Sequence, residues 1–261
     1  MPAASPDHAH EAHLHRRASI HSALGEPARL SIVDELVVTD RSPKELGDRL
    51  GMPTNLLTHH LDVLESVGLV VRFTSSGDRR RKYVRLVRDP LGSLRPIVSP
   101  LSGSPLSGSP NPRRALFVCT HNSARSQLAA ALWTARTGQP ADSAGTHPAD
   151  RVHRGAVAAG RRAGLDLSAA RPKVLERIDA SHQVVTVCDR AHEELEPAPD
   201  WWHWSIPDPV EVATPSAFDD VVADLGARID ALLDDPSHSP TSRPRNRPRN
   251  RPRDRPGHRP S

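Results

Sequence analysis

The stretch Arg114-Ala-Leu-Phe-Val-Cys-Thr-His-Asn-Ser-Ala-Arg-Ser-Gln, residues 114–127, decides the fold of the larger part of this chain. Four apolar residues run into Cys119, a short polar loop follows, and the apolar segment 128–133 predicts a helix. The order is therefore strand, tight loop and helix, with Cys119 opening the loop and Arg125 closing it. This order is typical of an oxyanion site, because the loop amides and the helix N-terminus both point inward.

Cys119 and Arg125 supply the chemistry that such a loop needs. The guanidinium of Arg125 can hold a tetrahedral anion through two parallel hydrogen bonds. The same positive field would keep Cys119 as a thiolate, which is the form that attacks. The spacing alone leaves open a buried cysteine that ends a core strand. Because a strand and a helix flank the loop, we expect a nucleophilic cysteine beside an anion pocket.

The segment 119–126 resembles the phosphate loop of low-molecular-weight protein tyrosine phosphatases and of the arsenate reductases that share their fold. The resemblance implies an α/β three-layer domain with a parallel sheet, and the anion site at the C-termini of the strands. It extends from about residue 114 to 235 and includes Ser143-Ala-Gly-Thr-His-Pro148, Gly164-Leu-Asp-Leu-Ser168, Val184-Val-Thr-Val-Cys188 and Pro207-Asp-Pro209. The implied catalytic residues are Cys119, Arg125, the general acid Asp208 and the second thiol Cys188. The implied oxyanion loop is Thr120, His121, Asn122, Ser123, Ala124 and Ser126.

Two reactions are compatible with this loop, and Cys188 separates them. A phosphatase of this family hydrolyses the cysteinyl intermediate, whereas an arsenate reductase takes two electrons from thiols and is left with a disulfide. Cys188 stands where the reductases carry their second cysteine, and Val210 replaces the Tyr that the phosphatases place after Asp-Pro. Both points favour thiol-dependent arsenate reduction, with protein tyrosine phosphatase activity as the alternative. A packing role or a purely protective disulfide stays open for Cys188.

The resemblance implies an external reductant rather than a bound cofactor, and no metal site is predicted. Thioredoxin-linked reductases carry a third cysteine seven residues after the second, and Leu195 occupies that position here. This departure favours a low-molecular-weight thiol or a glutaredoxin as the donor, with thioredoxin as the remaining option. A repressor whose enzyme domain only senses an oxyanion is a third possibility. The set Cys119, Arg125 and Asp208 argues against it, because binding alone needs neither a thiol nor an acid.

A second compact pattern lies between Ile20 and Leu86. The spacing over residues 21–36 predicts one helix, Ser42 caps a second, and Thr54 caps a third that Gly68 ends. Segments 69–73 and 82–86 are predicted strands, so a helix-turn-helix is followed by a hairpin with a basic flank, a wing. The third helix should present polar side chains to base edges, and the wing should contact phosphates. The predicted DNA-binding residues are Asn55, Thr58 and His59, with His60 and Asp62 on the same face, and Arg79, Arg80, Arg81 and Lys82.

This first domain resembles the ArsR family of winged-helix repressors, through Gly25-Glu-Pro-Ala-Arg29, Thr58-His-His-Leu-Asp-Val-Leu64 and Gly68-Leu-Val70. The resemblance implies a homodimer formed through the winged-helix domain, bound to an operator inverted repeat near genes for arsenical resistance. Metalloid-sensing members carry paired cysteines before the turn, and residues 36–40 contain none. A response to arsenite is therefore expected to need the thiols of the other domain, across a linker of about twenty residues.

Composition divides the 261 residues into five segments. They are a disordered His-containing N-terminus, 1–16; the winged helix-turn-helix domain, 17–95; a Ser/Gly/Pro linker, 96–112; the phosphatase or arsenate reductase-like domain, 113–235; and a disordered Arg/Pro tail, 236–261. The tail has eight Arg and one Asp, which give it a charge of +7. The net charge of +4 therefore comes from the tail and does not make the whole chain basic. Two cysteines exclude a disulfide scaffold. With no apolar run near ~18 residues and no signal peptide, we expect a cytoplasmic protein without a membrane partner.

Overall fold

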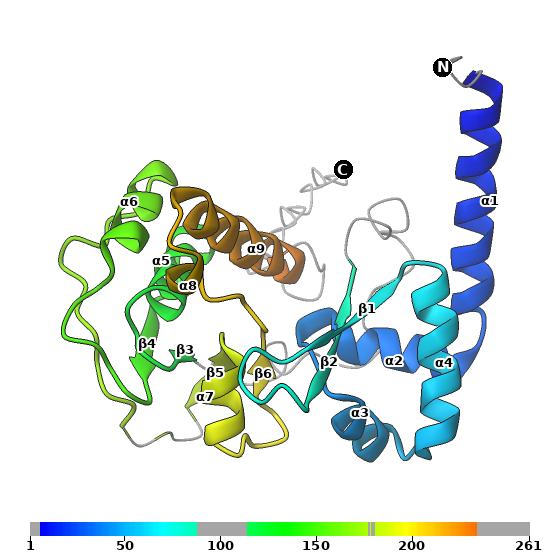
Figure 1. Cartoon of the computed structure of the whole chain (residues 1–261), viewed down its shortest axis with the longest axis horizontal. Helices are drawn as coiled ribbons and strands as arrows, with labels where there is room; N and C mark the ends of the chain where they lie inside the picture. The colour runs from blue at the N-terminus through cyan, green and yellow to red at the C-terminus, as the bar shows by residue number, and fades with distance from the viewer. Residues whose placement is uncertain (1–5, 88–113, 177, 179–180, 234–261) are drawn as a thin grey trace, which may run out of the picture.

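The computed structural model describes residues 6–87, 114–176, 178 and 181–233, which fold as two adjoining domains (Figure 1). A winged-helix domain is followed by an α/β domain with a four-stranded parallel sheet. The predicted fold class, a mainly helical winged helix-turn-helix and a three-layer α/β domain, is confirmed. The predicted linker, 96–112, and the predicted tail, 236–261, lie outside the described residues.

The first two helices differ from the sequence prediction. Helices α1 (Pro6–Leu24) and α2 (Pro27–Val38) replace the single helix expected over residues 21–36. The chain turns because Glu26 has extended backbone and accepts the Arg29 N–H at 2.9 Å, which starts a new helix with Pro27 in its first turn. The predicted disorder of 1–16 is also wrong for residues 6–16, which form the first half of α1. Ala, Leu, Glu and Arg in that segment are good helix formers.

The helix-turn-helix consists of α3 (Pro43–Leu50) and α4 (Thr54–Ser66). The predicted capping box is confirmed, because the Glu45 N–H donates to Ser42 Oγ at 3.2 Å and the Ser42 N–H donates to Glu45 Oε2 at 2.7 Å. The cap predicted at Thr54 is wrong, since Pro53 is the N-cap and makes no side-chain capping bond. Strands β1 (Val70–Thr74) and β2 (Lys82–Leu86) pair antiparallel as the wing.

The core of the winged-helix domain follows the apolar spacing of its helices. Leu57, Leu61 and Leu64 on α4 are each at most 1% exposed and pack in one cluster with the apolar side chains of α2 and β2. A stripe at this spacing brings all three side chains to one face of the helix. The opposite face of α4 is therefore free for polar residues.

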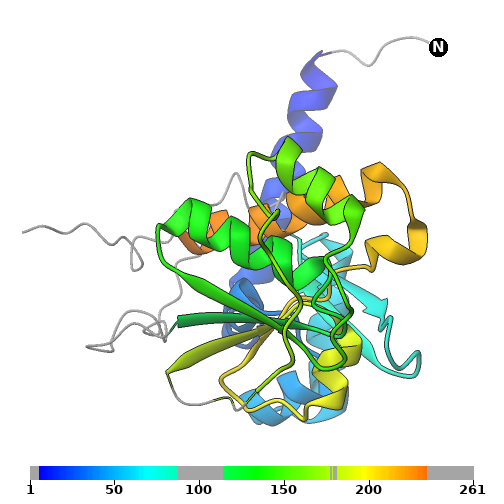
Figure 2. The ribbon, with the colours of Figure 1, turned by 90° about the vertical axis from the view of Figure 1, so that its left-hand side faces the viewer.

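The α/β domain is built on a parallel sheet with strand order β4-β3-β5-β6. Figure 2 shows α5, α6 and α9 above this sheet, with α7 and part of the winged-helix domain below it. The strands are β3 (Arg114–Cys119), β4 (Ala141–Gly145), β5 (His182–Thr186) and β6 (Trp202–His203). The helices are α5 (Arg125–Thr137), α6 (Arg154–Arg162), α7 (Asp189–Glu194), α8 (Pro209–Val212) and α9 (Pro215–Leu233). Both cysteines consequently lie at the carboxyl edge of the sheet, as the parallel arrangement predicts.

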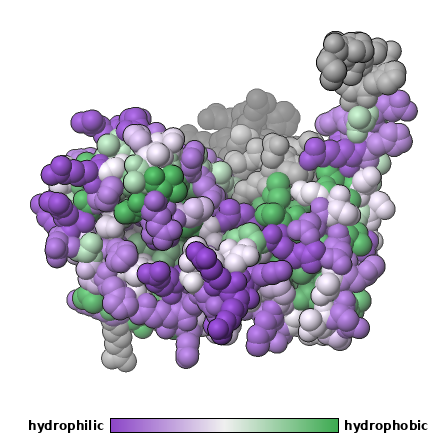
Figure 3. Space-filling view, in the orientation of Figure 1, coloured by the Kyte–Doolittle hydropathy of each residue, from purple (hydrophilic) through white to green (hydrophobic). Residues whose placement is uncertain are grey.

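The surface is mainly hydrophilic in the view of Figure 3, with small separate apolar patches. Val210 and Val212 in α8 and Leu56 in α4 are among the exposed apolar side chains. Isolated apolar residues of this kind are normal on a folded protein. Within the described ranges no helix combines the length and the apolar character needed to cross a bilayer.

The two domains also contact each other directly, which the sequence did not suggest. The Asp40 N–H donates to the His203 carbonyl at 2.7 Å, and the Trp204 indole N–H donates to the Val38 carbonyl at 2.9 Å. Arg228 of α9 places its two terminal nitrogens 3.0 and 3.2 Å from the carboxylate of Asp40. The thiols of the α/β domain are therefore connected to the winged helix through packed surfaces and not through the linker alone.

The charges of this interface are buried and paired. Asp40 is 2% and Arg228 3% exposed. Burial alone would raise the pKa of Asp40, but the guanidiniums of Arg228 and Arg85 outweigh it and hold that pKa below its usual value. The carboxylate also accepts the Ser205 N–H at 2.9 Å. Asp40 is thus ionised and depends on its partners in both domains.

Candidate active site

Cys119 ends β3 and opens a loop whose donors face its sulfur. The Asn122 N–H lies 3.2 Å from Cys119 Sγ, and Ser126 Oγ lies 3.0 Å from it. Cys119 itself is 2% exposed. Hydrogen bonds to a sulfur stabilise its thiolate form, so the loop suits a nucleophilic cysteine.

Asn122 holds the loop in its shape. Its φ of 47° lies in the left-handed region, which asparagine tolerates better than most residues. Its side-chain oxygen accepts from Gln127 Nε2 at 3.0 Å and from the Lys173 N–H at 2.8 Å, while its Nδ2 donates to Ser126 Oγ at 2.8 Å. Gln127 was not identified from the sequence, because a glutamine in the first turn of a helix has no distinctive pattern. The loop is therefore fixed before any anion enters.

Gly145, at the end of β4, lets the loop approach the neighbouring strand. A Cβ at this position would lie 2.7 Å from the Thr120 carbonyl oxygen and 3.0 Å from Asn122. Real side chains do not pack that closely, so a larger residue would displace the loop. This gives a physical reason for the glycine in the motif of residues 143–148.

Arg125 is the first residue of α5, and its side chain lies across the loop toward Asp208. Arg125 Nη2 is 2.6 Å from Asp208 Oδ2, and Nη1 donates to the Ile206 carbonyl at 3.1 Å. Burial would lower the pKa of Arg125, but the nearby Asp208 carboxylate opposes this, and the pKa lies above its usual value. The fork is thus charged and close to both thiols.

Asp208 begins α8, where its Oδ1 accepts the Val210 N–H at 3.0 Å. The carboxyl is half-buried at the pocket, so a proton on it can reach a group held by Arg125. The structure therefore places Cys119, Arg125 and Asp208 together, as the sequence analysis expected.

Cys188 lies in the same pocket as Cys119 and is 1% exposed. It is the N-cap of α7, its Sγ accepts the Ala191 N–H at 3.4 Å, and Thr120 Oγ1 lies 3.3 Å from it. Burial raises the pKa of the Cys188 thiol, despite the opposing effect of Arg125. Both cysteines are free. Cys188 is thus a protonated thiol beside the loop and not part of it.

The pocket has a volume of about 870 Å³, and most of its lining residues are polar or charged. Within the described part of the chain, none of its lining residues is Phe, Tyr or Trp, and no three His, Cys, Asp or Glu side chains gather as a metal site. Several lining residues were not identified from the sequence. They are Ser76, Ala149, Arg151, His153, Arg154, Arg190 and Glu211. Arg151, His153 and Arg154 follow closely after residues 143–148, which was the one signal that could have indicated them.

The predicted DNA-binding side chains lie apart from this pocket, on α4 and on the wing. Asn55, Thr58 and His59 are exposed on α4, and residues 79–82 are exposed on the wing. His60 was expected on the same face, but it is 7% exposed, with its Nδ1 3.7 Å from Glu26 Oε2. The α1–α2 turn covers that side of α4, so His60 faces the domain interior.

Two family models match this chain. Residues 114–239 match the low molecular weight phosphotyrosine protein phosphatase family, and residues 24–72 match a helix-turn-helix domain. No curated protein matches the chain.

Solved structures align with the α/β domain. Arsenate reductase from Archaeoglobus fulgidus is 26% identical, with 46% of this chain and 98% of that chain covered and a TM-score of 0.38. The tyrosine phosphatase Wzb from Escherichia coli K30 is 21% identical, with 45% and 93% covered and a TM-score of 0.40. The YwlE arginine phosphatase from Geobacillus stearothermophilus is 26% identical, with 47% and 92% covered and a TM-score of 0.42. From the two family matches and the fold, the chain is a helix-turn-helix domain fused to a domain of the low molecular weight phosphotyrosine protein phosphatase family.

Proposed function

We propose that this protein is a DNA-binding transcriptional regulator whose second domain is a thiol-dependent arsenate reductase. The observation that supports reduction is the second cysteine of the pocket. Cys188 lies beside the loop of Cys119 and is kept as a thiol by burial. Hydrolysis of a phosphate ester needs only one thiol, whereas arsenate reduction needs two electrons, which a pair of thiols can give.

In the first step the Cys119 thiolate attacks arsenic and forms a sulfur–arsenic bond. An arsenic–oxygen bond breaks, and Asp208 gives its proton to the departing oxygen, which leaves as water. Arg125 and the loop amides hold the remaining oxygens, because their charge is fixed before the reaction begins.

In the second step the Cys188 sulfur attacks the sulfur of Cys119. A disulfide forms, the electron pair of the sulfur–arsenic bond passes to arsenic, and arsenic(V) becomes arsenic(III). The proton of Cys188 passes to the arsenite that leaves. An external thiol, whether a low-molecular-weight thiol, a glutaredoxin or thioredoxin, then reduces the disulfide.

The composition of the pocket wall supports a small inorganic anion. The basic side chains Arg151, Arg154 and Arg190 line it, and the described lining residues include no Phe, Tyr or Trp to pack on an aryl ester. Protein tyrosine phosphatase activity is the second candidate, because Cys119, Arg125 and Asp208 serve both reactions. A repressor that only senses an oxyanion is the third, and turnover of arsenate by the purified full chain with several thiol donors separates it from the other two.

Replacing Cys188 with serine is expected to lower arsenate reduction at least ~100-fold while changing hydrolysis of an aryl phosphate by less than ~3-fold. Only the reduction uses the second thiol. Steady-state assays on both substrates test this, and mass spectrometry of the arsenate-treated wild type should detect one disulfide between Cys119 and Cys188. The control is Thr120→Val, which removes the hydroxyl beside Cys188 but keeps both thiols. An equal loss in both reactions would reduce Cys188 to a packing residue.

The winged-helix domain is proposed to bind an operator inverted repeat as a homodimer. Helix α4 would enter the major groove and present Asn55, Thr58 and His59 to base edges. Residues 79–82 would contact phosphates, and their exposure supports this role.

Replacing residues 79–82 by alanine is expected to weaken binding to all DNA sequences. The slope of log K against log salt should fall by about 0.9 for each phosphate that the wing no longer neutralises. Thr58→Ala is the control, because a residue at base edges should alter sequence preference and leave the salt slope unchanged. Fluorescence anisotropy over a range of salt concentrations measures both. An unchanged slope in the wing variant would show that the wing does not bind the DNA backbone.

A further inference from the structure

One side of the catalytic pocket comes from the other domain. Ser76, in the turn between β1 and β2, lines the pocket together with Cys119, Arg125, Cys188 and Asp208. Ser76 is the one residue of the winged-helix domain among the described lining residues. The turn of the DNA-binding wing therefore reaches the catalytic site.

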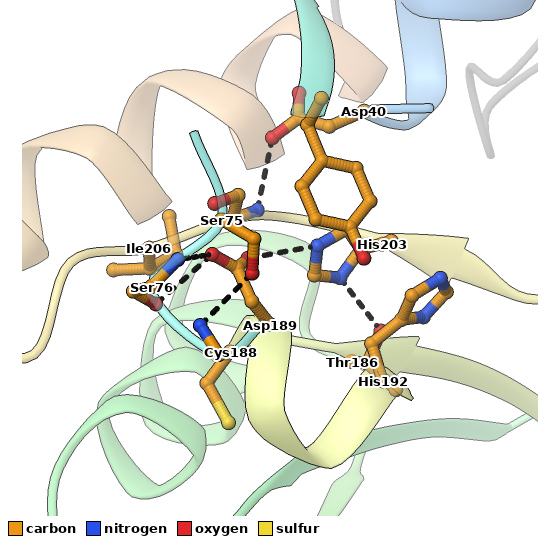
Figure 4. Close-up of polar contacts among 12 residues, drawn as sticks. Asp40, Ser75, Ser76, Thr186, Cys188, Asp189, His192, His203 and Ile206 are labelled. Carbon is orange, nitrogen blue, oxygen red and sulfur yellow. Dashed lines mark hydrogen bonds and ion pairs between the residues drawn. The ribbon is translucent and has the colours of Figure 1, made fainter. Parts of the chain in front are cut away.

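Two carboxylates of α7 hold this turn in place, and Figure 4 shows the first of them, Asp189, beside Ser76. The N–H and the hydroxyl of Ser76 bond to Asp189 Oδ2 at 2.7 and 2.9 Å. Ser75 Oγ and the Asp78 N–H bond to the two oxygens of Glu193, each at 2.7 Å. Asp189 directly follows Cys188, so this hydrogen-bonded carboxylate is one residue from a pocket thiol.

Asp189 is itself fixed from the other side. It is 1% exposed, and its Oδ1 lies 3.0 Å from His203 Nε2. Burial would raise the pKa of Asp189, but the His203 contact and further hydrogen bonds lower it below its usual value. The turn is thus bound to an ionised carboxylate that cannot rotate freely.

Gly77 lets the turn lie flat against α7. A Cβ at this position would overlap the Glu193 carboxylate and would lie 3.0 Å from the Arg190 backbone nitrogen. The Glu193 carboxylate and the Arg190 backbone would both have to move, so a side chain at this position would push the turn away from α7. The surfaces of the wing turn and of α7 are therefore complementary.

We propose that the wing turn is a wall of the catalytic pocket and that Ser76 is a specificity-determining residue, which limits the size of the anion that the pocket admits. The inference rests on the anion pocket of the proposed enzyme and does not require that the reaction be arsenate reduction. The single proton of the Ser76 hydroxyl bonds to Asp189, so Ser76 has none left to donate to an anion. Its role is consequently steric, and it acts on groups attached to the anion more than on the anion itself.

The test compares two ligands on the full-length chain by titration calorimetry, which needs no turnover. Inorganic phosphate probes the loop, and a naphthyl phosphonate probes the loop together with the wall. Ser76→Phe should leave the Kd for phosphate within about twofold and raise the Kd for the phosphonate at least about tenfold. Gly77→Val, which pushes the turn away from α7, should also change the Kd for the phosphonate alone. It serves as the second variant should Ser76→Phe not fold.

Val71→Phe is the matched control, because it adds the same ring at an exposed position of the same hairpin outside the pocket. It should change neither Kd. A selective loss of phosphonate affinity in Ser76→Phe supports the proposal, whereas a selective gain contradicts a steric role. Unchanged affinity for both ligands, or a parallel change in both, overturns it. A failure of the Cys188→Ser test would refute the reductase reaction and leave this result untouched.

Discussion

Replacing Cys119 with serine is expected to abolish turnover of any oxyanion substrate, with a loss of at least ~10⁴-fold. A serine hydroxyl keeps its proton near neutral pH, and the described partners of the Cys119 sulfur, Asn122 N–H and Ser126 Oγ, are not bases that would remove it. The hydrogen bonds from Asn122 and Ser126 can still form to an oxygen, so the loop should keep its shape. Steady-state kinetics with arsenate and with an aryl phosphate measure the loss.

Two controls accompany this variant. Cys119→Ser should retain inorganic phosphate binding and an unchanged circular dichroism spectrum. Arg125→Lys, which keeps the charge but not the fork between Asp208 and the Ile206 carbonyl, should also lose most of its turnover. Retention of more than a tenth of the activity by Cys119→Ser would mean that the nucleophile is misassigned.

Replacing Arg228 with methionine should lower the free energy of unfolding by about 3–5 kcal/mol, although the residue is far from the chemistry. The change leaves Asp40 as a buried carboxylate without its main partner. Because the folded pKa of Asp40 lies below its unfolded value, its contribution is present at neutral pH and is lost as the pH falls through the folded value. Urea denaturation at pH 7 therefore measures it in full.

The matched control is Arg162→Met. Arg162 pairs with Asp219 at 2.6 Å, but both side chains are nearly half exposed, so the loss should be at most about 1 kcal/mol. The double variant Asp40→Leu with Arg228→Met should lose less than Arg228→Met alone, since no charge is then left buried. Similar small losses in Arg228→Met and Arg162→Met would mean that the domain interface contributes little to stability.

The sequence predicted those features that short-range contacts determine. Ser42 and Glu45 lie three residues apart and satisfy each other, so the capped start of α3 could be predicted. Cys119 and Arg125 belong to one loop between a strand and a helix. Their placement at one anion site could therefore be predicted as well. Asp208 was assigned through the resemblance alone, because no local pattern links a residue in an Asp-Pro turn to a loop 83 residues away.

The sequence-based predictions were wrong or incomplete where the burial or the contacts of a residue depend on distant parts of the chain. His60 has the helical position of an exposed residue, but the α1–α2 turn covers it. The hydrogen bonds between Ser76 and Asp189 join residues 113 positions apart in separate domains. The contacts around Asp40 are made by polar and charged groups from segments far apart in the sequence, which no local pattern could reveal.

The two domains are held together by the close fit at Gly77 and by the buried pair of Asp40 and Arg228. These contacts also affect how much the length of the chain between Val87 and Arg114 matters. Surface contacts, and not the connecting segment, set the positions of the two domains. In general, each doubling of the length of a connection adds only about 0.6 kcal/mol in closure entropy. Insertions in this segment are therefore expected to be tolerated, whereas a side chain at residue 77 is expected to displace the wing turn from α7.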